Sequence, residues 1–337
     1  MITKDDLETI DKNGMYKIYD KWPEIAKSSY EFEWEPLNYQ NIDHIVFAGM
    51  GGSGSIGDIF SSILSKTNLH VSVVKGYILP NTVDENSLVV VTSVSGNTVE
   101  TLSILDQANK LNCNLIAFSS GGEIEKLCST HDIDYRKIKQ FISPRASTVS
   151  FIYSMLKILK LILPINETEI IESIKNLEKL QIQISSENLT NSNQAIKLAQ
   201  DISKIPLIYY PWGLQAAAIR FKNSLQENSK MHALVEDVVE ASHNGIVAWE
   251  SKSEVLPILL QGHDDNIKTK DRWRIFKKYF DKNGIKFFEV SSIEGDILSK
   301  LIHLIYFLDY TSIYKAVLSN IDPTPVNSIN FVKSELK

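Results

Sequence analysis

The sequence predicts an α/β protein built from two similar units in tandem, and three observations support this prediction. Short apolar segments alternate with longer amphipathic segments along most of the chain. The apolar segments are almost continuously hydrophobic, which is typical of strands buried on both faces of a parallel sheet. At 337 residues the chain is also longer than one hydrophobic core usually serves.

The first alternation begins after about forty residues that carry acidic and aromatic side chains in a loosely helical pattern. We expect those residues to form a helix and a strap that lie over a domain. The expected strands of the first sheet are the apolar segments 44–50, 71–78, 88–94 and 114–120. The helices expected between them cover 55–66, 98–111 and 122–129. This order predicts a parallel sheet with helices on both faces.

The second alternation follows a helical connection. A long helix is expected from Arg145 to Leu163, starting just after Pro144, and a helical hairpin over 166–203. The strands expected next are 205–212, 255–262 and 285–290, and the helices are 214–230, 267–281 and 295–318. A tail over 321–337 ends in a short helix. We therefore expect an N-terminal domain over 1–155 and a C-terminal domain over 156–337.

Composition and charge exclude several classes of partner. The net charge of −6 provides no basic surface for nucleic acid or an anionic membrane. The longest apolar segment, 151–165, is too short to span a bilayer and is interrupted by Lys157 and Lys160. The N-terminus lacks the pattern of a signal peptide, and the two cysteines suit reduced structural thiols. These features predict a cytoplasmic protein.

No metal or cofactor is expected from the sequence. The seven histidines never fall within five residues of one another, and no His-Glu-x-x-His or comparable pair of ligands is present. A zinc-dependent mechanism is therefore not expected.

A glycine-rich segment, GMGGSGSIGD over 49–58, follows the first expected strand and opens a helix. Backbone N–H groups can approach a ligand closely at Gly51 and Gly52, and the helix N-terminus favours an anion. Ser53 can add a hydrogen bond to a phosphate oxygen. The dinucleotide-binding interpretation lacks the acidic residue that should follow about 20 residues later, and no Gly-Lys-Ser/Thr supports a nucleotide P-loop.

A second polar segment, TSVSGNTVETL over 92–102, places Ser93, Ser95 and Thr98 around a glycine turn. Each segment alone could be explained by helix capping. Two hydroxyl-rich loops at the same ends of neighbouring parallel strands favour an anion site instead, because parallel sheets bind ligands at that edge. A site of hydroxyls and amides suits a sugar phosphate.

Together these motifs resemble the sugar isomerase (SIS) domain. The segments SPRAST (143–148), RFKNSLQENSK (220–230), SHNGIVAWE (242–250) and DPTPVNSINFVK (322–333) extend the resemblance to the bifunctional phosphoglucose/phosphomannose isomerases, over nearly the whole chain. The resemblance implies two tandem SIS domains, each a parallel sheet sandwiched by helices. It also implies interconversion of glucose 6-phosphate and/or mannose 6-phosphate with fructose 6-phosphate through a cis-enediolate.

The resemblance also implies a role for each candidate residue. Glu227 would be the base that moves a proton between C1 and C2, and His243 would open the sugar ring. Lys333 would lie near the hydroxyls at the ring end, and Arg145 would offset charge on the enediolate oxygen. Phosphate would be bound by Gly51, Gly52, Ser53, Ser93, Ser95 and Thr98. In the family, this histidine reaches the site of the neighbouring subunit, which implies a homodimer.

Other functions remain open at this stage. An amino-sugar phosphate isomerase would need a way to handle the amine at C2, and no N-terminal cysteine of the glutaminase type is present. A non-catalytic sugar-phosphate sensor would keep the serine-rich loop but would not require Glu227, His243 and Lys333. A nucleotide-dependent dehydrogenase is the most distant alternative, because the acidic ribose partner is missing. Selectivity between glucose and mannose phosphates would depend on the space around the C2–C3 bond of the substrate.

Overall fold

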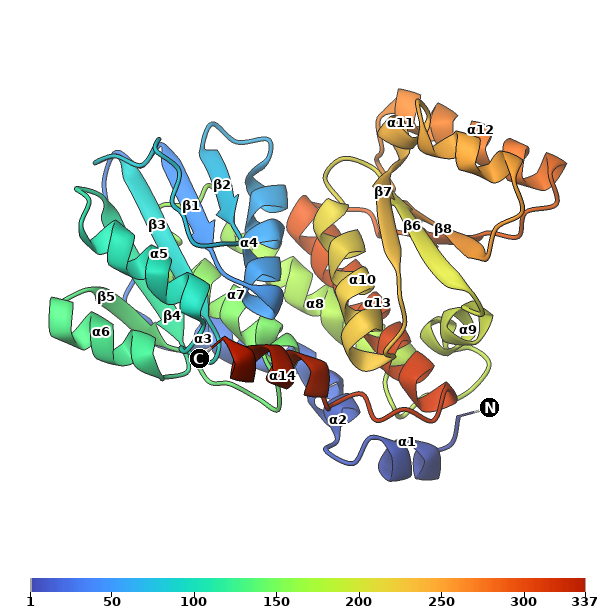
Figure 1. The fold of residues 1–337 in the computed structure, drawn as a ribbon, viewed down its shortest axis with the longest axis horizontal. Helices are drawn as coiled ribbons and strands as arrows, with labels where there is room; N and C mark the ends of the chain where they lie inside the picture. Colours follow the sequence, from blue (N-terminus) through green and yellow to red (C-terminus); the bar gives the residue numbers. More distant parts are fainter. Residues whose placement is uncertain (1, 337) are drawn as a thin grey trace. The chain divides into compact units, whose positions relative to one another are not determined.

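The computed structural model describes residues 2–336, which form two compact units (Figure 1). The N-terminal unit comprises Lys21–Lys175, and the C-terminal unit comprises the residues up to Asp20 and those from Asn176 onward. The expected domain boundary at 155/156 falls within a helix, and the first helices of the chain pack with the C-terminal unit. Each unit has its own parallel sheet.

The N-terminal unit is built on a five-stranded parallel sheet with the order β2-β1-β3-β4-β5. Its strands are β1 (His44–Ala48), β2 (His70–Val74), β3 (Ser87–Ser93), β4 (Asn114–Ser119) and β5 (Asp134–Lys137). Every residue of β1 and β3 is buried, which explains the apolar run at the centre of each strand. Strand β2 stops before the expected end at 78. Strand β5 was not expected, because it is a polar strand at the edge of the sheet.

Helices cover both faces of this sheet, as the sequence predicts. They are α3 (Trp22–Glu31), α4 (Gly51–Leu64), α5 (Val99–Asn109), α6 (Glu123–His131) and α7 (Thr148–Ile158), and α8 (Glu167–Ile184) crosses the division between the units. Helices α4 and α7 pack together on one face, and α5 and α6 lie on the other (Figure 1).

The long helix expected over 145–163 is not continuous. Residues Arg145–Ser147 form a 3₁₀ turn, η1, and α7 follows from Thr148 to Ile158. The chain then turns before Pro164, whose ring disfavours a helical conformation in the residue before it. Arg145 therefore lies in a tight turn and not on a regular helix.

The C-terminal unit contains a four-stranded parallel sheet with the order β7-β6-β8-β9. Its strands are β6 (Ile205–Tyr210), β7 (Leu234–Asp237), β8 (Val255–Gln261) and β9 (Phe288–Ser291). Strand β7 was not expected, because it is short, half-exposed and ends in two acidic residues. The expected strand at 285–290 begins later, at Phe288.

The helices of this unit include α9 (Gln194–Asp201), which lies within the hairpin expected over 166–203. They also include the three longer helices and the short tail helix that the sequence predicts. They are α1 (Lys4–Ile10), α2 (Met15–Asp20), α9, α10 (Gln215–Asn228), α11 (Val238–Ala241), α12 (Ile267–Lys282), α13 (Ile297–Leu318) and α14 (Asn327–Glu335), with a 3₁₀ segment η2 (Gly245–Glu250). The N-terminal residues thus form short helices, more than the one helix and strap expected.

Helix α13 forms the centre of this unit and packs against α10, α9 and α2. Its Asp309 is fully buried and accepts hydrogen bonds from Arg220 at 2.6 and 3.0 Å, and from Ser224 at 2.6 Å. The Tyr19 hydroxyl of α2 also donates to Asp309, at 3.0 Å. Burial lowers the pKa of Arg220, but Asp309 and other nearby anionic groups outweigh this effect and raise it overall. These contacts hold α10 and α2 on α13.

No helix within residues 2–336 is long and apolar enough to cross a membrane.

Candidate active site

The first part of the candidate site lies at one edge of the N-terminal sheet. Strands β1 and β3 are parallel neighbours, and the chain leaves them toward opposite sides of the sheet. Ligands bind at such a switch point in open α/β sheets, outside the carboxyl ends of the strands. The prediction that the two polar loops follow neighbouring strands at the same edge is confirmed.

The glycine-rich loop after β1 is tightly built. Gly51 has a φ of +54°, which favours glycine, and begins α4. A Cβ atom on Gly52 would lie 3.4 Å from the backbone of Pro144 and Arg145. The buried Ser53 hydroxyl accepts a hydrogen bond from the Val94 N–H at 3.0 Å. This serine therefore ties the first loop to the loop after β3.

The loop after β3 carries the other three predicted hydroxyls. The hydroxyls of Ser93 and Thr98 lie 3.0 Å apart, and Ser93 Oγ also accepts from the Gly96 N–H at 3.1 Å. Ser95 Oγ accepts from the Asn97 N–H at 3.4 Å. The loop is thus held in shape by its own polar groups.

A third loop, which follows β4, completes this edge. The role of this loop in the site was not predicted from the sequence. Gly96 has a φ of +70°, and a Cβ atom there would lie 1.7 Å from the Gly121 carbonyl oxygen. A Cβ on Gly122 would lie 2.6 Å from the Ser95 carbonyl oxygen. The only hint in the sequence is the glycine pair that follows an apolar strand.

The N-termini of α4 and α5 both open at this edge without a side-chain cap. Met50 cannot cap α4, and Thr98 precedes α5 but makes no capping hydrogen bond with its hydroxyl, which contacts Ser93 instead. The first N–H groups of a helix need partners from outside it. The arrangement therefore suits an anion better than it suits simple capping.

Arg145 lies beside the glycine-rich loop. Its backbone N is one of the atoms nearest to Gly52, and its side chain is only 4% exposed. The turn that holds it is stabilised by Ser147, whose hydroxyl donates to the Ser143 carbonyl at 2.8 Å. The structure thus brings Arg145 together with the predicted phosphate loop.

Glu227 lies in the C-terminal unit, near the end of α10, and is half-buried. The end of the helix is fixed on α13 by Asn228, which donates to Ser312 Oγ at 2.8 Å, and by Ser229, which donates to the Ser312 carbonyl at 2.7 Å. Lys230 donates to the carbonyl of Glu227 and, at 3.3 Å, to the carbonyl of Pro323. Lys230, which sequence reasoning did not single out, joins the candidate base to the start of the tail.

His243 is exposed, in the loop between α11 and η2. The loop is braced by Asn244, whose amide donates to Glu240 at 2.7 Å. The carboxylate of Glu236 lies close to Gly245, because a Cβ atom there would lie 2.2 Å from one of its oxygens. Burial, followed by the charges of Glu240 and Asp237, raises the pKa of Glu236.

Lys333 lies on α14, a helix with no buried side chain. Within residues 2–336, the ammonium group of Lys333 forms no hydrogen bond or ion pair. The structure therefore places Lys333 on the tail that Lys230 anchors, but does not bring it together with His243.

A metal-binding group of three or more His, Cys, Asp or Glu side chains is absent from the described residues.

Comparisons of the sequence with protein families match both halves of the chain. Residues 38–161 match the SIS domain, and residues 191–336 match the bacterial phospho-glucose isomerase C-terminal SIS domain. Both units therefore have the SIS fold that the sequence predicts.

Curated relatives match over almost the full length. A bifunctional phosphoglucose/phosphomannose isomerase of Caldicellulosiruptor bescii is 32% identical, over 96% of this chain and 98% of the relative. The protein of the same name from Aquifex aeolicus is 31% identical, over 91% of this chain and 95% of the relative. A D-glucosamine-6-phosphate 4-epimerase of Sulfolobus acidocaldarius is more distant, at 25% identity over 73% of this chain and 77% of the relative.

Solved structures agree on the fold. The C-terminal domain of glucosamine-fructose-6-phosphate aminotransferase from Francisella tularensis has a TM-score of 0.68 at 17% identity, covering 90% of this chain and 95% of that domain. A putative tagatose-6-phosphate ketose/aldose isomerase from Clostridium novyi has a TM-score of 0.69 at 14% identity, covering 95% and 93%. At these identities the likeness establishes the fold alone.

Proposed function

The chain belongs to the family of bifunctional phosphoglucose/phosphomannose isomerases, and we propose that it interconverts glucose 6-phosphate and mannose 6-phosphate with fructose 6-phosphate. The observation that carries the proposal beyond family membership is the pair of uncapped helix N-termini at the switch point of the N-terminal sheet. They lie beside a set of preorganised hydroxyls, which together suit the phosphate common to all three sugars.

The phosphate is proposed to bind to the loops after β1 and β3. Gly51 and Gly52 let the backbone N–H groups at the start of α4 approach its oxygens. The hydroxyl groups that can donate to the phosphate are those of Ser53, Ser93, Ser95 and Thr98. Several already hold the loop in shape, so little ordering would be needed when the substrate binds.

Glu227 is proposed as the base that carries the proton between C1 and C2. A carboxylate fixed near the end of a packed helix can take the proton from one carbon and return it to the other. Release of the C2 proton from an aldose leaves a cis-enediolate, and return of the proton to C1 gives the ketose. Return to either face of C2 would give the glucose or the mannose epimer.

Three further side chains are proposed to assist. His243 would protonate the ring oxygen and open the sugar ring, and Lys333 would bind hydroxyls at that end of the substrate. Arg145 would stabilise the negative charge that develops on the enediolate oxygen, because its guanidinium stays protonated. We also propose a cytoplasmic homodimer in which His243 is donated to the partner's site.

The test is an assay of the purified protein with fructose 6-phosphate in the presence of EDTA, in which glucose 6-phosphate and mannose 6-phosphate are measured separately. We expect both products from the wild type. Glu227→Gln should lower kcat by at least about 10³-fold, or roughly 4 kcal/mol of barrier. Glu178→Gln, which changes an exposed glutamate on α8, is the control and should leave kcat unchanged.

Failure to form either product would contradict the proposal. If fructose 6-phosphate nevertheless raised the melting temperature of the inactive protein, the phosphate loops would stand and a sensor would replace the enzyme. Formation of one product alone would restrict the proposal to one epimer. A variant Glu227→Gln with normal kcat would remove this residue from the mechanism.

The similarity to the D-glucosamine-6-phosphate 4-epimerase favours one second candidate, an enzyme that acts on an amino-sugar phosphate. Glucosamine 6-phosphate should then be converted faster than fructose 6-phosphate in parallel assays of the same preparation. We expect the opposite order, because the curated relatives with the higher identity carry the phosphoglucose/phosphomannose name.

A further inference from the structure

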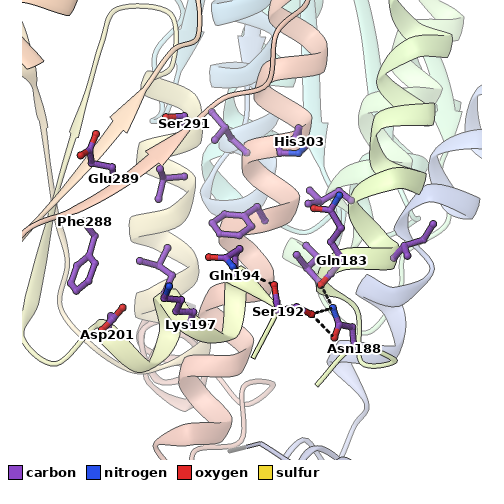
Figure 2. Close-up of a pocket in the computed structure, with 17 residues that line it drawn as sticks. Gln183, Asn188, Ser192, Gln194, Lys197, Asp201, Phe288, Glu289, Ser291 and His303 are labelled. Carbon is purple, nitrogen blue, oxygen red and sulfur yellow. Dashed lines mark hydrogen bonds between the residues drawn. The ribbon is translucent and has the colours of Figure 1, made fainter. Parts of the chain in front are cut away.

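A cavity of ≈ 660 Å³ opens in the C-terminal unit, and none of the residues proposed above for catalysis or phosphate binding lines it. Its walls come from α8, α9, the edge strand β9 and the first half of α13. Figure 2 shows Phe288 and Glu289 on one side of the cavity and Gln183 and His303 on the other. The volume lies within the range of small-molecule sites in proteins.

Much of the wall is apolar. Phe288 of β9 and Phe307 of α13 line it, together with the buried side chains of Leu198 and Leu304. Aromatic and branched walls favour a ligand with a flat or compact apolar body. A hydrated sugar phosphate would not match this surface, because the sugar phosphate has almost no apolar area of its own.

The charges around the cavity leave one cation uncompensated. Asp201 is paired with Lys286 at 3.4 Å, and Glu289 is paired with Lys277 at 3.0 Å. Lys197 of α9 also lines the cavity, and within residues 2–336 no ion pair or hydrogen bond is formed by its ammonium group. The wall therefore offers an anionic ligand a positive charge that no carboxylate already occupies.

The wall of the cavity also includes the ring of His303, one nitrogen of which is unsatisfied. Nδ1 of His303 is buried and has no hydrogen-bond partner among the described residues. Burial lowers the pKa of His303 to about 4, so the imidazole is neutral at physiological pH. A buried polar atom without a partner costs about 1–3 kcal/mol, which a ligand in the cavity would recover once the ring turns Nδ1 toward it.

We propose that this cavity binds a small organic anion that has an apolar ring body and a single acidic group. The ring body packs against Phe288 and Phe307, and the acidic group pairs with Lys197. A polar atom of the ring body forms a hydrogen bond with His303. Carboxylate, phosphate and sulfonate groups can all pair with the ammonium group of Lys197. The proposal therefore specifies a class of ligand and not a single compound.

The test uses anilinonaphthalene sulfonate, which has an aromatic body and one anionic group, and its uncharged analogue N-phenylnaphthylamine. Both are titrated into the full-length protein, with fluorescence for affinity and calorimetry for stoichiometry. We expect saturable binding of the sulfonate at one site per chain. Saturating fructose 6-phosphate should not displace it, because the cavity contains none of the residues proposed to bind the sugar phosphate.

Two variants locate the bound probe. Lys197→Gln should weaken binding of the sulfonate by about fivefold and leave the uncharged analogue unaffected, as expected for a partly solvated ion pair. Gln194→Trp replaces an exposed residue of the cavity wall and should abolish binding of both probes by filling the space. Lys282→Gln removes an exposed lysine at the end of α12, outside the cavity, and is the charge-matched control.

The proposal is overturned if the sulfonate does not bind, or if both cavity variants bind it as the wild type does. Displacement by fructose 6-phosphate would also overturn it, because the probe would then occupy the sugar-phosphate site. Equal melting temperatures of the variants and the wild type, measured without probe, show that the fold is intact. The result does not depend on whether the isomerase proposal holds, since no readout uses turnover.

Discussion

Gly96 shows how single residues shape the phosphate edge of the N-terminal unit. Its φ of +70° is unfavourable for any other residue, and a Cβ atom would lie 1.7 Å from the Gly121 carbonyl. Gly96→Ala should therefore lower the free energy of unfolding by at least about 2 kcal/mol. It should also raise the KM for fructose 6-phosphate, because Ser93 and Ser95 flank the displaced turn. Chemical denaturation and steady-state kinetics measure the two effects.

The control for this prediction is Gly76→Ala. A Cβ atom on Gly76 meets no atom within 4 Å, and its backbone is not in the left-handed region. The change in stability should stay within about 0.5 kcal/mol. If Gly96→Ala behaved like Gly76→Ala in both measurements, the close packing of the loops after β3 and β4 would not matter for binding.

At the scale of elements, the buried pair of Arg220 and Asp309 decides how α10 sits on α13. Asp309→Asn leaves a buried guanidinium without its countercharge and should cost about 3–5 kcal/mol of stability. The double variant Arg220→Met with Asp309→Leu should recover part of that loss, because no buried charge remains unpaired, while the hydroxyls of Ser224 and Tyr19 lose their acceptor. Thermal and denaturant unfolding of both variants checks the prediction.

A matched exposed pair provides the control for Asp309. Asp271 lies 3.9 Å from Lys268 and 3.7 Å from Arg274 on the surface of α12, and Asp271→Asn should change stability by no more than about 1 kcal/mol. Equal effects of Asp309→Asn and Asp271→Asn would show that the buried pair does not hold the helices together.

The elements also show what the sequence can and cannot predict. Strands β1, β3, β6 and β8 were found because burial on both faces requires continuous apolar residues. Strands β5 and β7 were missed because both are four-residue edge strands with charged side chains, whereas the edge strands β2 and β9 were predicted from their apolar residues. A short polar edge strand is stabilised by pairing with its neighbour, and no local pattern of residues records that pairing.

The candidate site likewise contains residues that the sequence predicts and residues that it does not. The loops that carry Gly51 and Ser93 were predicted because a glycine-rich turn after a buried strand leaves a local pattern. Lys230 and Glu236 were missed because their contacts, with Pro323 and with Gly245, depend on tertiary structure. The roles of Glu227, His243 and Lys333 remain predictions that came from the resemblance to the family.

At the scale of the whole molecule, the proposed homodimer makes a prediction that no single variant can test. If His243 serves the partner's site, a chain with Glu227→Gln still supplies a normal histidine, and a chain with His243→Asn still supplies a normal base. A heterodimer of the two inactive chains then contains one site with both groups intact. If His243 serves its own chain, neither site of the heterodimer has both.

We therefore expect that mixing the two inactive variants after denaturation and joint refolding restores activity. With random pairing, half of the dimers are mixed and half of their sites are intact, which gives about a quarter of wild-type activity for a symmetric dimer. Light scattering coupled to size-exclusion chromatography shows whether dimers form. Dimers without restored activity would place His243 in the site of its own chain, and monomers with full wild-type activity would remove the partner from the mechanism.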